Sequence, residues 1–193
     1  MAFNHNDHYH ALMLRQVPHG ATRALDVGCG TGAFARRLAA RGIAVEGVDA
    51  DQRVIDIAAG TPARGVTFRR ADVTSDALPE GHYDYISCLA SLHHMPFGTV
   101  TRLRAALRPG GVLAVLGCYR EVLPAELPVS LVAVGANALA RVAHAGRGER
   151  MTAAATQPTV TLREIRAESA RLLPGSAVRR LLFWRYLLVF HRS

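Results

Sequence analysis

The sequence predicts an α/β fold in which helices cover both faces of a mostly parallel sheet. Short apolar segments alternate with segments of helical character from residue 23 to residue 117, and this alternation is typical of parallel strands joined by helices. Three glycines at every second position follow the first apolar segment, where they let the backbone turn sharply and pass close to a ligand. With 193 residues, half of them hydrophobic, the chain is expected to form a single domain over residues 1–193.

The part of the chain up to residue 117 contains five predicted strands. They lie at residues 23–27, 43–48, 66–70, 83–89 and 112–117. Helices are predicted between them at residues 33–40, 51–59 and 99–107. Asp51 and Thr99 are the expected N-caps of the second and third helices. The Pro109-Gly110-Gly111 sequence is expected to end the third helix and turn the chain into the fifth strand.

The alternating pattern breaks over residues 118–160, which are predicted to form an insertion on the substrate side of the sheet. Its apolar stretch, residues 129–145, is expected to be a helix there, with a helix of the core as the alternative. The insertion and an N-terminal cap segment, residues 1–19, are together expected to form the substrate pocket. Because the insertion is apolar, the substrate is expected to have an apolar portion.

The last part of the chain predicts one helix and one hairpin. Thr161 and Glu164 are spaced as in a capping box, which predicts a helix that continues to residue 173. Two strands are predicted at residues 177–183 and 186–191, with a turn near Trp184.

The composition restricts the classes of partner. The net charge of +8 is the excess of 23 arginines over 15 acidic residues, with no lysine in the chain, and the arginines are scattered rather than clustered. This favours a solvated surface over a nucleic-acid interface. The three cysteines show no metal-ligand spacing, so no metal is expected, and they are interpreted as reduced thiols of a cytoplasmic protein. No apolar run approaches the ~20 residues needed to span a membrane.

The glycine-rich segment, residues 24–32, reads Ala-Leu-Asp-Val-Gly-Cys-Gly-Thr-Gly. It resembles the first motif of the class I S-adenosylmethionine-dependent methyltransferases, in which this loop lies under the cofactor. The resemblance implies that Gly28, Cys29 and Gly30 contact S-adenosylmethionine and that Asp26 accepts a hydrogen bond from the cofactor ammonium. A nicotinamide site is the first alternative, but it requires Gly-x-Gly-x-x-Gly, and the acid would repel a pyrophosphate. A tight turn without a ligand is the second.

The order of the predicted elements is similar to the Rossmann-like seven-stranded fold of the same methyltransferases. That fold is mostly parallel and has an antiparallel last strand. The resemblance extends over roughly residues 20 to 193 and is strongest up to Gly117.

Two further acids follow successive strands and are expected to bind the cofactor. Asp49, with Ala50 after it, lies 19 residues beyond Gly30, at the distance at which an acid in dinucleotide folds accepts from ribose hydroxyls. The family resemblance implies that Asp72 accepts from the adenine amine and that the amide of Val73 meets a ring nitrogen. The alternatives are a helix N-cap for Asp49 and a turn-capping carboxylate for Asp72.

The end of the fourth predicted strand supplies the candidate catalytic groups. Leu89 and Ala90 are expected to pass beside the cofactor, and His93 and His94 to face the substrate. A neutral imidazole can take a proton from a nucleophile; a structural role for one histidine is the alternative. Tyr9 is expected to fold over the cofactor and exclude water from the methyl group, unless the terminus is frayed and solvated.

These observations predict S-adenosylmethionine-dependent methyl transfer to an oxygen or nitrogen atom of a small, partly apolar molecule. The chain lacks the Asn/Asp-Pro-Pro-aromatic motif of nucleic-acid amino-methyltransferases. Two alternatives stay open: an RNA methyltransferase, and a protein of this fold that binds the cofactor without transferring the methyl group.

Overall fold

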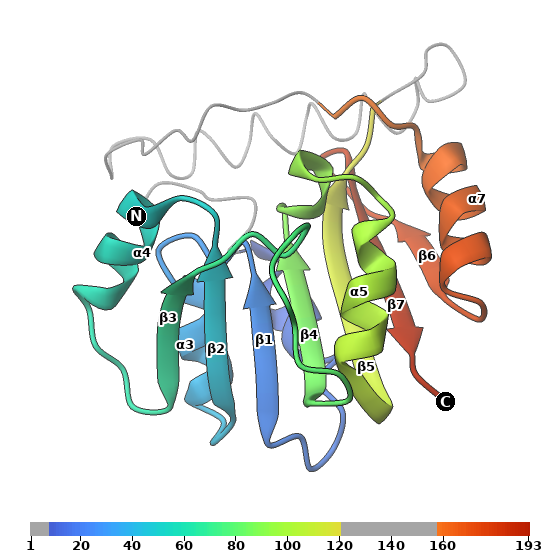
Figure 1. The fold of residues 1–193 in the computed structure, drawn as a ribbon. Coiled ribbons are helices and arrows are strands. Elements are labelled where there is room, and N and C mark those ends of the chain that lie inside the picture. Colours follow the sequence, from blue (N-terminus) through green and yellow to red (C-terminus); the bar gives the residue numbers. More distant parts are fainter. Residues whose placement is uncertain (1–7, 121–157) are drawn as a thin grey trace.

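The computed structural model describes residues 8–120 and 158–193. In these residues the chain forms a seven-stranded sheet with the strand order β3-β2-β1-β4-β5-β7-β6 (Figure 1). Strands β1 to β5 are parallel, and β7 is antiparallel to both of its neighbours, β5 and β6. The predicted fold class, a mostly parallel sheet with an antiparallel last strand, is therefore confirmed.

The strands are β1 (Arg23–Val27), β2 (Ala44–Asp49), β3 (Val66–Arg70), β4 (Tyr83–Leu89), β5 (Leu107–Cys118), β6 (Ala177–Arg180) and β7 (Arg185–His191). The helices are α2 (His10–Leu14), α3 (Ala33–Ala39), α4 (Gln52–Ala59), α5 (Thr99–Ala106) and α7 (Leu162–Leu172), with the short 3-10 helix η1 at Leu92–His94. None of the described helices has the length and apolar character needed to cross a membrane.

Helices cover both faces of the sheet because each face is apolar. On one face, Phe34 and Leu38 of α3 and Met13 of α2 are buried against strands that include β1 and β5. On the other face, α5 and α7 bury side chains such as Leu103 and Ile165 against the same sheet (Figure 1). The buried middle strands explain why the sequence gives continuous apolar runs there rather than alternation.

Most predicted caps and ends are confirmed. Asp51 caps α4 by accepting from the amide of Arg53, and Thr161 and Glu164 form the predicted capping box of α7. The prediction for Thr99 was wrong: Gly98 is the N-cap of α5, and the Thr99 side chain is buried instead.

Two strand boundaries also differ from the prediction. Strand β5 begins at Leu107, so that the Pro109-Gly110-Gly111 sequence lies within the strand, where the pairing register with β4 shifts. Strand β6 ends at Arg180, because the chain then enters the turn in which Phe183 and Trp184 adopt positive φ angles. The predicted helix at residues 129–145, and the insertion apart from its first and last residues, lie outside the described residues.

Candidate functional site

The parallel strands β1 to β4 end at the same edge of the sheet, the upper edge in Figure 1. Open α/β sheets bind their ligands at this carboxyl edge. The strand pairing brings the loop after β1, Asp49 at the end of β2, Asp72 just after β3 and the loop after β4 to this edge. The sequence-predicted cofactor residues are thus placed on one side of the molecule.

The loop after β1 is held by backbone hydrogen bonds. The amides of Gly28 and Cys29 both donate to the carbonyl of Val48, at 2.8 and 3.0 Å. Gly28 has φ 66°, and a Cβ added to it would overlap the Cβ of Ser91. Position 28 therefore requires glycine for two reasons: the backbone is left-handed there, and the loop after β4 approaches it closely.

Gly30 differs from Gly28 because its open side faces no described atom. It has φ 55°, and a Cβ added there would have no atom within 4 Å. The backbone at Gly30 thus leaves room for a ligand, as a loop under a cofactor requires. Arg36 of α3 holds the far end of the loop by donating from its guanidinium to the carbonyl of Thr31 at 2.6 Å and to that of Ala58 at 2.7 Å.

Asp49 holds the glycine loop and keeps accepting capacity. Its Oδ2 accepts from the amide of Gly30 at 3.1 Å, and its Oδ1 accepts from the amide of Asp51 at 3.1 Å. Each carboxylate oxygen can accept more than one hydrogen bond, so the partly exposed carboxylate has positions left for a diol. Since Asp51 takes the N-cap of α4, the alternative cap role of Asp49 is excluded. Ala50 beside it is exposed.

Asp26 lies below the loop rather than on its surface. It is 1% exposed, and its Oδ1 accepts from the hydroxyl of Ser87 at 2.7 Å. Burial raises the pKa of Asp26 to about 7, and the Ser87 hydrogen bond opposes this shift. Within the described part of the chain, Asp26 Oδ2 has no hydrogen-bond partner. Direct contact between Asp26 and a cofactor ammonium stays a prediction.

Asp72 is exposed and its Oδ1 is engaged in a local turn. This oxygen accepts from the amide of Thr74 at 2.9 Å and from its hydroxyl at 2.6 Å, which lowers the pKa of the carboxyl group. The turn-capping role that was the alternative is therefore present. It leaves Oδ2 without a hydrogen bond from the described residues, so a contact between Asp72 and adenine stays a prediction. The contact between the Val73 amide and an adenine ring nitrogen also stays a prediction; the side chain of Val73 is buried.

The loop after β4 is pinned to the loop after β1. The amide of Ala90 donates to the carbonyl of Leu116 at 2.7 Å, and the buried hydroxyl of Ser91 donates to the carbonyl of Val27 at 2.7 Å. Ala90 has φ 53°, a conformation that L-residues seldom adopt. The sequence-based reasoning missed Ser91; the glycine at position 28 was the signal, since it implied a close neighbour.

His93 and His94 form η1 with Leu92, directly after this loop. Their rings lie 4.0 Å apart between centroids, at an interplanar angle of 39°. Burial, followed by the charges of His94 and Arg185, lowers the pKa of His93 to about 4. His93 is therefore neutral at physiological pH, and its buried Nδ1 has no hydrogen-bond partner among the described residues. His94 is exposed.

Tyr9 lies in the core beside the β6–β7 turn. It is 7% exposed, and its hydroxyl donates to the carbonyl of Leu182 at 3.0 Å. Burial raises the pKa of Tyr9. The frayed-terminus alternative is therefore excluded for Tyr9, whereas the predicted contact with the cofactor stays a prediction. The sequence predicted Arg185 at the hairpin turn, where the structure makes it the first residue of β7, but the sequence did not indicate a functional role for it.

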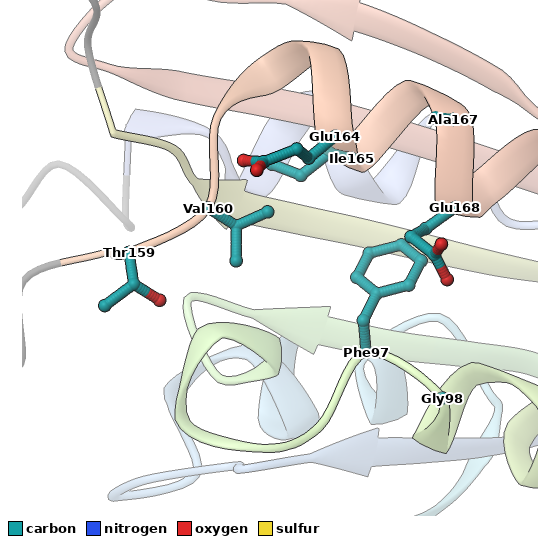
Figure 2. Close-up of a pocket in the computed structure, with 8 residues that line it drawn as sticks. All are labelled: Phe97, Gly98, Thr159, Val160, Glu164, Ile165, Ala167 and Glu168. Atoms are coloured by element: carbon teal, nitrogen blue, oxygen red, sulfur yellow. The ribbon is translucent and has the colours of Figure 1, made fainter.

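A cavity of about 530 Å³ opens between the segment after η1 and α7. Phe97, Val160 and Ile165 form its apolar lining, and Figure 2 shows the Phe97 ring and the Val160 side chain on either side of the space. The two acids at its wall are already engaged: Glu164 accepts from Thr161, and Glu168 pairs with Arg171. The free lining is therefore mainly apolar.

Comparison with known proteins matches these features to one family. Residues 24–111 match the family model described as a methyltransferase domain. The uncharacterized methyltransferase Rv0089 of Mycobacterium tuberculosis is 36% identical over 97% of this chain and 96% of its own length. Shorter matches include the ubiquinone biosynthesis O-methyltransferase of Burkholderia ambifaria, 34% identical over 46% of this chain and 41% of that protein. The 27-O-demethylrifamycin SV methyltransferase of Amycolatopsis mediterranei is 34% identical over 48% of this chain and 37% of that protein.

Solved structures show the same fold at low identity. The S-adenosylmethionine-dependent methyltransferase of Mesorhizobium loti superimposes with a TM-score of 0.65 at 20% identity, over 95% of each chain. A phosphoethanolamine N-methyltransferase of Haemonchus contortus in complex with S-adenosylmethionine has a TM-score of 0.63 at 19% identity, over 90% of this chain and 38% of that one. The strand order, the glycine loop and the full-length relative lead to one conclusion: the chain belongs to the class I S-adenosylmethionine-dependent methyltransferases.

Proposed function

We propose that this methyltransferase transfers the methyl group of S-adenosylmethionine to an oxygen or nitrogen atom of a small, partly apolar molecule. The observation that carries this proposal is the cradle at the carboxyl edge. There Gly30 leaves open space beside a carboxylate, Asp49, that already accepts from the Gly30 amide. Ribose hydroxyls donate to such a carboxylate, and Asp72 and the loop at Leu89 and Ala90 would bound the adenine and the rest of the cofactor.

When bound, S-adenosylmethionine supplies an electrophilic methyl group with a neutral leaving group. The protein then has to hold the acceptor in line, exclude water and, for a hydroxyl, remove a proton. Alignment of this kind can contribute on the order of 7–11 kcal/mol. Neutral His93, with the unpartnered Nδ1, is our candidate for the proton acceptor, and His94 is the second candidate.

The nature of the acceptor is inferred from two features. The apolar lining of the cavity beside α7 would receive an apolar portion of the molecule. Two of the relatives named above carry O-methylation in their names, which favours a hydroxyl over an amine. Tyr9 and the segments outside the described residues are proposed to complete the acceptor pocket.

The test is incubation of the full chain with methyl-labelled S-adenosylmethionine and a fractionated cell extract. We expect label in the small-molecule fraction, extractable into organic solvent, together with stoichiometric S-adenosylhomocysteine. Asp49→Asn at low cofactor concentration is the control and should reduce labelling. Label in the RNA fraction, with a steep loss of binding as salt rises, would favour the RNA alternative. Cofactor binding without any labelled product would favour the non-transferring alternative.

A further inference from the structure

Arg185 is placed at the acceptor side of the sheet by the pairing of β7 with β5. It is the first residue of β7 and pairs in register with Cys118, the last residue of β5. Its guanidinium donates a hydrogen bond to the Sγ of Cys118. Because β5 runs parallel to β4, Cys118 and Arg185 lie at the carboxyl edge, at which β1 to β4 also end.

Three titratable groups from three different elements lie within electrostatic range of Arg185. They are the hydroxyl of Tyr9 just before α2, the imidazole of His93 in η1 and the thiol of Cys118 in β5. The positive charge lowers the pKa of each group, although burial has the larger effect and raises the pKa of Tyr9 and Cys118 overall. Arg185 therefore lies among the residues that the proposed function assigns to the acceptor side.

No carboxylate compensates Arg185 within the described residues. The ion pairs formed there involve four other arginines: Arg53, Arg69, Arg108 and Arg171. The Nε of Arg185 is buried and has no hydrogen-bond partner among the described residues. A partly buried cation without an opposite charge is costly, and such groups are concentrated at functional sites.

The backbone that precedes Arg185 is strained. Phe183 and Trp184 have φ angles of 59° and 55°, although bulky L-residues seldom adopt the left-handed region. The turn is held by a hydrogen bond from the Leu181 amide to the carbonyl of Arg185, at 2.8 Å. Ala90, at the end of β4, is the other non-glycine residue with a positive φ in the described residues. Strained conformations of this kind are held by the surrounding structure and are concentrated at active sites and ligand sites.

We propose that the guanidinium of Arg185 binds an anionic oxygen of the methyl acceptor, and that the acceptor is therefore an acidic hydroxyl compound, a phenol or enol, bound as its oxyanion. This inference rests on the proposed function and narrows its acceptor class. In the ionisation step the O–H bond breaks, the electron pair stays on the oxygen facing Arg185, and the proton passes through the neutral imidazole of His93 to bulk water, which leaves His93 neutral again. Arginine suits this role because its charge persists at all relevant pH values.

The experiment uses 4-nitrophenol as a probe with the full chain and no cofactor. Binding is followed by quenching of Trp184, the single tryptophan of the chain, and ionisation by the absorbance of the nitrophenolate. We expect the pKa of the bound probe to fall by about one unit, since an adjacent cation favours the charged form. Arg185→Gln should abolish the shift and weaken nitrophenolate binding about tenfold, whereas Arg185→Lys should retain part of it.

Arg179→Gln is the matched control, because it removes the same charge from an exposed position of the neighbouring strand β6 and should behave as the wild type. Thermal unfolding verifies that each variant is folded. An equal probe pKa in the wild type and Arg185→Gln would overturn the proposal, as would the absence of quenching by 4-nitrophenol. Binding of 4-nitrobenzoate through Arg185 without a shift for 4-nitrophenol would also overturn it, because Arg185 would then anchor a remote carboxylate.

This test can fail independently of the proposed function, because it measures binding and not methyl transfer. A labelled small-molecule product whose formation is indifferent to Arg185→Gln would contradict only the role of Arg185. Anion binding through Arg185 without any labelled small molecule would contradict only the proposed methyl acceptor class.

Discussion

The proposed cofactor side and the proposed acceptor side of this sheet edge hold their charged groups by different means. At the cofactor side, backbone amides of Gly30 and Asp51 donate to the carboxylate of Asp49, and the geometry follows from glycine positions. At the acceptor side, His93 and Arg185 come from distant parts of the chain, and each keeps a buried nitrogen without a partner among the described residues. The cofactor side has one such atom as well, Oδ2 of Asp26, but the loop above it is held by backbone hydrogen bonds. The comparison teaches that the backbone fixes the geometry of the first group of residues, whereas side chains from separate elements make up the second.

The largest expected effect tests the acceptor side. His93→Ala should lower turnover roughly 10²–10⁴-fold if the imidazole removes a proton, with affinity for S-adenosylhomocysteine unchanged. Turnover of the wild type should rise with pH through about 4 and then stay level, because only the neutral imidazole accepts a proton. Single-turnover rates at saturating acceptor measure this effect. Exposed His94 provides the comparison variant, His94→Ala, and the general-base role is wrong if neither variant slows the reaction tenfold.

The second prediction separates two glycines of the cofactor side. Gly28→Ala should cost roughly 2–5 kcal/mol of unfolding free energy, because the new Cβ would overlap Ser91 and the left-handed backbone disfavours alanine. Gly30→Ala should cost only the conformational part, about 1–2 kcal/mol, but should weaken cofactor binding if the cofactor occupies the open space beside Gly30, as we propose. Urea unfolding and calorimetry with S-adenosylhomocysteine measure the two losses; equal stability losses would contradict the distinction.

Asp49→Asn should weaken S-adenosylhomocysteine binding by about 1.5–3 kcal/mol, the range for hydrogen bonds to a charged group. The matched variant is Asp51→Asn, which removes a charge two residues away and keeps an N-cap that asparagine can also form. Calorimetry should show little change for that variant. An equal loss in both variants would mean that Asp49 acts through the local charge and not through contact with the ribose.

The smallest effect is a pH dependence of stability. Between pH values of about 4 and 6.5, the folded chain holds a proton on Asp26 that the unfolded chain has lost, because the pKa of Asp26 is raised to about 7. In the same range the unfolded chain holds a proton on His93 that the folded chain has lost, because the pKa of His93 is lowered to about 4. The first effect lowers the unfolding free energy as pH rises, and the second raises it, each by ~1.4 kcal/mol per pH unit. The two slopes should nearly cancel in the wild type.

Single substitutions should reveal each slope. Asp26→Asn should leave an unfolding free energy that rises with pH in this window, and His93→Gln should leave one that falls. The double variant should be nearly level again. Urea titrations at several pH values provide the measurement, and parallel profiles for the two single variants would contradict the opposed linkage.

The sequence predicted the glycine turn after β1 and most of the helix caps because these signals are local. The glycine spacing, the N-cap at Asp51 and the capping box of Thr161 all act over a few residues. The contacts of Asp26, Asp49 and Asp72 with the cofactor stay predictions. The misplaced cap at Thr99 and the early start of β5 show where local rules fail, since burial of Thr99 and pairing of Leu107 with Tyr83 decided those positions. Arg185 could not be assigned a role from sequence, because its hydrogen bond to Cys118 and its electrostatic effect on His93 depend on the sheet order.

The left-handed residues Ala90, Phe183 and Trp184 have a consequence for the evolution and engineering of this enzyme. A glycine in place of Ala90 would relieve backbone strain without removing a large side chain, and it is the kind of change that a search for heat-resistant variants selects. A glycine in place of Phe183 would instead remove a phenyl ring that is buried in the core and would lower stability. Heat resistance is therefore within reach of a single change at the loop after β4, whereas the turn before Arg185 is kept in its strained conformation by the packing of Phe183.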